Sequence, residues 1–176
     1  MKISKKYLIV TIITILLALL INAYIIMHSC LDAASSTEAS KGVIETTQEI
    51  INDIKPGTIN ESNYSDFATF IRKAFGHFGL FSISGFLTSL AVFLVLYPFK
   101  WSKYYMPIIL SLEFGLLMGL ITETIQLGVD GRSGELLDVL IDFSGYLLGF
   151  LIIFLILFLI IRHLHKNEMK NKECID

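Results

Sequence analysis

The sequence predicts an all-α integral membrane protein: a four-helix bundle with an extracytoplasmic amphipathic helix between the first and second spanning helices. Hydrophobic residues make up 54% of the 176-residue chain and gather in long runs. A helix needs about 20 mostly apolar residues to cross a bilayer. Four segments reach this length, at about 7–27, 74–97, 104–128 and 137–161. Strand alternation typical of membrane barrels is absent from the sequence. We therefore expect a single membrane domain over 1–176.

The basic residues predict that both termini are cytoplasmic. With the N-terminus inside, nine lysine or arginine residues fall on the inner side and five on the outer side, as the positive-inside rule favours. The inner set is Lys2, Lys5, Lys6, Lys100, Lys103, Arg162, Lys166, Lys170 and Lys172, and the outer set is Lys41, Lys55, Arg72, Lys73 and Arg132. The expected location is the cell membrane. These residues form no basic stripe with interleaved aromatics, so we expect no nucleic-acid partner.

The first apolar segment has an alternative interpretation as a cleaved signal peptide over 1–34. A signal peptide has an apolar core of about 7–15 residues, whereas this core is nearer twenty. We therefore favour a spanning helix. Cys30 and Cys174 fall on opposite sides of the membrane in this topology, and their spacing matches no metal site.

The loop over about 29–65 contains a predicted amphipathic helix at 37–54. Ser35 and Glu38 would form its capping box, and the Lys55-Pro56-Gly57 run would end it. This helix would lie flat on the outer membrane face or fold over the bundle, either as a packing element or as a lid. Its apolar stripe consists of Val43, Ile44, Thr47, Ile50, Ile51 and Ile54.

Small residues at helical spacing predict a close-packing stripe on each of the last two spanning helices, facing a neighbouring helix. The third helix carries Ser111, Gly115, Gly119, Thr122 and Gln126, and the fourth carries Asp138, Asp142, Gly145 and Gly149. A short turn at 98–103 makes the second and third helices antiparallel neighbours. Glu113 lies off this seam, and we expect it in a packed, protonated interface in preference to a separate polar path.

Polar residues gather where three helices approach the outer side. Ionisable groups in a membrane segment are costly, so they face the bundle interior and often mark function. At a rise of 1.5 Å per residue, His77, Glu123 and Asp142 lie about one turn below the outer surface. Arg72 and Lys73 are expected to snorkel outward above them. We expect Arg132 above the cluster and Asp138 within it.

These motifs resemble the VanZ-like family over about 65–160. They are Arg72-Lys73-x-x-x-His77-Phe78, Glu123-x-x-Gln126, and Arg132 followed by Asp138-x-x-x-Asp142-x-x-Gly145-x-x-x-Gly149. The resemblance implies a bacterial membrane protein with a role at the cell envelope, because the family's namesake is associated with low-level teicoplanin resistance. The family usually has Asn where this chain has Asp142, and often an acid where it has Gly79. The first change adds a titratable group, and the second removes a partner for Arg72 or Lys73.

Three functions compete. The first is a membrane enzyme that acts on an anionic, lipid-linked headgroup. Its substrate would be bound by Arg72, Lys73, Gln126 and Arg132, and its catalytic groups would be His77, Glu123, Asp138 and Asp142. The second is a non-catalytic factor that binds envelope lipid or a glycopeptide. The third is a structural role, in which the charges only lock the bundle.

No cofactor is expected. The sequence has no nucleophile elbow, phosphate loop or zinc-ligand spacing. His77, Glu123, Asp138 and Asp142 have the chemistry to hold a metal, but ion pairing among the charged groups is the interpretation we favour.

Overall fold

The computed structural model describes residues 4–98 and 105–173, which form helices and no strand. The chain begins with α1, Lys5–Ser29, and α2, Ala33–Ile54. It continues through α3, Tyr64–Ile71, the π-helix η1, Arg72–Gly79, and α4, Leu80–Leu96. It ends with α5, Met106–Leu127, and α6, Leu136–Glu173.

Four of these segments are long and apolar enough to span a membrane, as the sequence predicts. They are Lys5–Ser29, Tyr64–Leu96, Met106–Leu127 and Leu136–His163. The second is longer than expected because α3 and η1 continue into α4 without a break. The turn predicted at 98–103 falls almost entirely outside the described residues.

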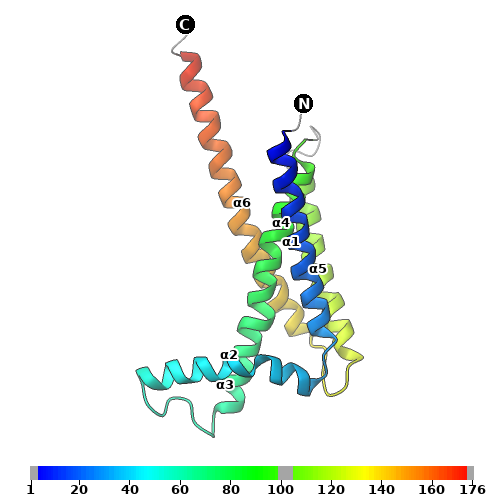
Figure 1. The fold of residues 1–176 in the computed structure, drawn as a ribbon, viewed down its shortest axis with the longest axis vertical. Helices are drawn as coiled ribbons and strands as arrows, with labels where there is room; N and C mark the ends of the chain where they lie inside the picture. Colours follow the sequence, from blue (N-terminus) through cyan, green and yellow to red (C-terminus); the bar gives the residue numbers. More distant parts are fainter. Residues whose placement is uncertain (1–3, 99–104, 174–176) are drawn as a thin grey trace.

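The helix arrangement separates the two ends of the molecule. The start of α1 and the end of α6 lie at one end, and α2 crosses the opposite end together with α3 (Figure 1). Helix α4 packs against α1, α5 and α6 and is therefore the central element of the bundle. We refer to the end crossed by α2 as the α2 end.

Glycines bring α4 and α6 into backbone contact. A Cβ added to Gly149 would lie 2.0 Å from the Ser82 carbonyl oxygen, and one added to Gly145 would lie 2.2 Å from that of Phe78. From the other side, a Cβ on Gly85 would lie 2.1 Å from the Tyr146 carbonyl oxygen. The predicted small-residue stripe of the fourth helix therefore packs mainly against the second.

The middle of the bundle contains a hydrogen-bonded polar group supplied by α1. Asn22 donates to Thr88 Oγ1 at 3.0 Å and accepts from Ser84 Oγ at 2.8 Å. Both partners belong to α4, so this amide ties the first helix to the central one. The apolar core beside it contains Ile25, Phe81, Met118 and Tyr146.

Helix α2 begins earlier than predicted. Asp32 is its N-cap and accepts a hydrogen bond from the Ser35 amide at 2.7 Å; this bond lowers the pKa of Asp32. The expected capping box of Ser35 with Glu38 is therefore wrong, because an acid three residues upstream takes the cap. Ile44 packs on α3, whereas Ile50 and Ile54 stay exposed. An exposed apolar edge is suited to the membrane surface.

Glu113 is not in a packed interface, contrary to expectation. Its side chain lies on an exposed face of α5, while Ser111 and Gly115 on either side are buried. The packing seam faces one way along this helix, and Glu113 points away from it.

The close contact between α4 and α6 predicts an asymmetric response to glycine substitution. Gly149→Ala should lower the free energy of unfolding by about 1–3 kcal/mol, since the added methyl forces the backbones apart. Gly119→Ala is the matched control, because its Cβ would meet nothing closer than 3.5 Å. Thermal unfolding in detergent measures both variants. Equal stability of the two would contradict the tight crossing.

The charge distribution predicts the side on which the α2 end lies. In a variant without Cys30 and Cys174, a cysteine placed at position 60 should react with an impermeant thiol reagent in intact cells. A cysteine at position 170 should react only after lysis. The opposite labelling pattern would invert the molecule and place the polar cluster inside.

Candidate functional site

The π-helix η1 carries His77 and precedes the close packing of α4. π-helical turns are rare and are frequently found at functional sites. Here η1 lies beside the first turns of α6. Two pairs of side chains connect them: Lys73 meets Asp138, and His77 meets Asp142. The two pairs are four residues apart on both helices, so they lie one helical turn apart between segments that run in the same direction. We call the Lys73–Asp138 pair the outer rung and the His77–Asp142 pair the inner rung.

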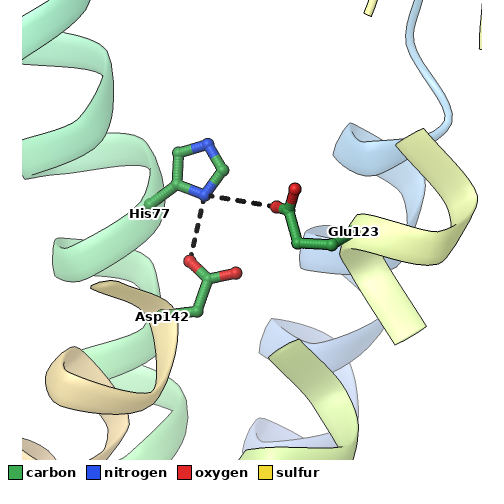
Figure 2. A group of neighbouring side chains, drawn as sticks. All are labelled: His77, Glu123 and Asp142. Atoms are coloured by element: carbon green, nitrogen blue, oxygen red, sulfur yellow. Dashed lines mark hydrogen bonds and ion pairs between the residues drawn. The ribbon is translucent and has the colours of Figure 1, made fainter. Parts of the chain in front are cut away.

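One imidazole nitrogen of His77 lies beside two buried carboxylates. His77 Nδ1 is 3.0 Å from Asp142 Oδ1 and 3.8 Å from Glu123 Oε1 (Figure 2). Asp142 is completely buried and Glu123 is 4% exposed, so water does not screen them. The other ring nitrogen, Nε2, points away from both carboxylates. We call these three residues the His77 cluster.

Glu123 is held in place from two directions. Its Oε1 accepts a hydrogen bond from Gln126 Nε2 at 3.1 Å, and its Oε2 accepts one from the Glu135 amide at 3.0 Å. The second bond satisfies a backbone donor just before α6, where helices leave such donors without intrahelical partners. Gln126 is thus a support for Glu123, and its amide nitrogen is engaged within the protein.

Lys73 turns toward α6 and forms ion pairs there. Its Nζ lies 2.5 Å from Asp138 Oδ1 and 3.3 Å from Glu135 Oε2. The expectation that Lys73 snorkels outward is therefore wrong. Two carboxylates within reach provide a stronger partner than bulk water, and 28% of the lysine side chain remains exposed.

Both arginines reach elements near the N-terminus. Arg132 Nη1 donates to the carbonyl oxygens of His28, at 3.3 Å, and Leu31, at 3.4 Å, where the end of α1 favours a cation. Burial lowers the pKa of Arg132, while Glu123 acts in the opposite direction. Arg72 donates to Thr37 of α2 and Thr69 of α3, each at 3.3 Å.

These groups surround a cavity of about 470 Å³ at the α2 end. Residues of every described helix and of the loop before α6 line it. His77, Asp138 and Asp142 line it together with Arg72, Lys73 and Arg132. Exposed Glu135 also lines the cavity, which connects the buried cluster with the surface.

The structure thus brings His77, Glu123 and Asp142 into one cluster. Asp138, which was expected in the same cluster, forms an ion pair with Lys73 instead. Sequence analysis missed three contributors. Glu135 contacts Lys73 and supports Glu123, and its position three residues before Asp138 was the available signal. Thr122 Oγ1 lies 3.4 Å from Asp142 Oδ2. His28 lines the cavity from α1, which no local motif indicates.

Four spanning helices and a polar cavity at one end define a multi-pass integral membrane protein. The chain belongs to the VanZ/LLP1 family, whose model matches residues 12–159. This match confirms the VanZ-like resemblance and extends it from residue 65 back to residue 12, so that it covers most of α1 and all of α2. No curated protein and no solved structure matches the chain significantly.

The ion pairs of Lys73 predict non-additive effects on stability. Lys73→Met should lower the free energy of unfolding by about 1–3 kcal/mol. The lower value is typical of exposed ion pairs, and the higher value of buried ones. Adding Asp138→Asn should recover part of this loss, because it removes the unpaired buried charge. Lys41→Met, at an exposed site on α2, is the control. Strictly additive costs in thermal unfolding would show that the pair is not coupled.

Proposed function

We propose that the protein binds and acts on the anionic headgroup of a lipid or lipid-linked envelope component at the outer membrane surface. The supporting observation is the polar cavity at the α2 end, which combines three cationic side chains with the His77 cluster. The basic-residue bias supports an outer location for this end. Family membership favours a contribution to low-level glycopeptide resistance in a bacterial envelope.

The cavity has groups suited to an anion. Arginine pairs with phosphate and carboxylate through parallel N–H donors. The hydrogen bonds of Arg72 go to neutral hydroxyls at 3.3 Å, and an anionic oxygen is a stronger acceptor. Arg132, held at the end of α1, would bind the same ligand, and Lys73 would do so by sharing its charge with Asp138.

An apolar groove next to the cavity supports a lipid ligand. It measures about 530 Å³ and is lined by Phe70, Ala74, Phe78 and Ile141. Thr69 and Lys73 line both the groove and the cavity. An amphiphile with its chain in the groove would therefore place its headgroup beside Lys73.

The His77 cluster provides proton chemistry for this headgroup. When Nδ1–H donates to Asp142, the lone pair of Nε2 is free to accept a proton. Asp142 would orient the ring, and Glu123 would stabilise its charged form. A positioned acid–base group of this kind contributes about 10²–10⁴-fold to a rate.

A structural lock is the second candidate, because many of the polar groups already have partners. Glu123 accepts two hydrogen bonds, and Lys73 makes two ion pairs. Such a network would hold the ends of η1, α5 and α6 together without a ligand. The two candidates differ in whether function and stability can be separated.

Charge-changing variants of similar volume separate them. His77→Gln, Glu123→Gln and Asp138→Asn should all insert, and should restore glycopeptide tolerance in a deletion strain far less than their loss of stability accounts for. Glu49→Gln, on the exposed side of α2, is the matched control and should restore it. The measurements are inhibitory concentrations over a glycopeptide panel, together with thermal unfolding and lipid analysis. Function that falls only in proportion to stability would favour the lock.

A further inference from the structure

We propose that the His77 cluster binds one divalent transition-metal cation, such as Zn²⁺ or Mn²⁺, with an open coordination position toward the cavity. One ligand atom from each of His77, Glu123 and Asp142 lies within 4.8 Å of the other two. Bonds of 2.0–2.1 Å in a tetrahedral site place ligand atoms roughly 3.3 Å apart. The observed separations of 3.0 and 3.8 Å from Nδ1 lie on either side of this value.

The balance of charge around the cluster favours a cation. In the described part of the chain, three carboxylates, of Glu135, Asp138 and Asp142, line the cavity beside three permanent cations, and Glu123 adds a fourth carboxylate next to His77. Lys73 pairs with Glu135 and Asp138. Within the described residues, neither Glu123 nor Asp142 has an ion pair with lysine or arginine. Two buried carboxylates therefore share one imidazole, which carries at most a single positive charge.

The ligand set indicates the class of cation. Imidazole nitrogen suits zinc and neighbouring transition metals, while carboxylate oxygens also accept manganese. Three protein ligands with a further position open to water or substrate are typical of catalytic metal sites. The Gln126 amide and the Glu135 backbone amide already orient Glu123, as outer partners do in such sites.

A cation here would deepen the proposed function. An anionic headgroup that enters this cavity meets three carboxylates beside the three cationic side chains, so these fixed charges largely cancel. A divalent ion on the His77 cluster would make the cavity net positive and offer its open position to a headgroup oxygen. This link rests on the proposed function, whereas the cation site itself does not. With the ion on Nδ1, the ring hydrogen lies on Nε2, so the ion and bound water replace His77 as the reactive group.

Cation binding is testable without a substrate. The full chain, purified through a tag without histidine and stripped with EDTA, should bind one equivalent of Zn²⁺ or Mn²⁺ in calorimetry. The ion should also raise its unfolding temperature, because it binds the folded state. His77→Gln, Glu123→Gln and Asp142→Asn should each weaken affinity at least about tenfold. His28→Gln and Asp138→Asn are the matched controls and should keep it.

Two outcomes would overturn the site. One is that the folded wild type binds no stoichiometric Zn²⁺ or Mn²⁺. A proton shared among the three side chains would then balance the negative charge of the carboxylates. The other is binding that survives the three variants. Should those variants fail to fold, magnetic resonance of Mn²⁺ on the wild type must still show coupling to an imidazole nitrogen.

The role of the cation is tested separately with vesicles of phosphatidylcholine that contain or lack phosphatidylglycerol. The metal-loaded protein should prefer the anionic vesicles, and EDTA should remove that preference. Cation binding without any lipid preference would refute the proposed headgroup function and leave the metal site standing. A lipid preference unchanged by EDTA would refute the link between them.

Discussion

The close packing of η1 and α4 against α6 is the constraint on which the polar cluster depends. Gly145 and Gly149 bring the two backbones into contact below the cluster. The segments run in the same direction, so this contact fixes which residues of η1 and α6 meet above it. His77 thereby reaches Asp142, and Lys73 reaches Asp138 one turn further out. A wider crossing would separate His77 from Asp142 and Lys73 from Asp138.

The two rungs differ in the charge that they balance. The outer rung joins Lys73 to two acids, one of them half exposed, and water shares the cost of its charges. The inner rung joins a histidine to Asp142, which is completely buried, with Glu123 nearby. In a membrane the inner groups are the more costly to charge. The inner rung is therefore where a proton or a bound ion has the largest energetic effect.

Much of the fold follows from the sequence, because helix length and small-residue spacing are local signals. The four spans and the buried stripes of α5 and α6 required nothing else. The direction of Lys73 did not follow, since it depends on Glu135 and Asp138 being within reach across a helix contact. Likewise, Asp32 is the N-cap of α2, where Ser35 was expected. The π-helix has no local sequence signature. The convergence of His77 with Glu123 and Asp142 was predictable only because their depths agreed.

The candidate site also depends on the part of the chain before the recognised motifs. Arg132 is held by the carbonyl oxygens of His28 and Leu31 at the end of α1, and Arg72 by Thr37 of α2. These contacts turn both arginines toward the wall formed by the first two helices. Without α1 and α2 the cavity would lose the residues that line it from these two helices. The match of the family model from residue 12 is consistent with this dependence, because a cavity needs its wall as much as its reactive groups.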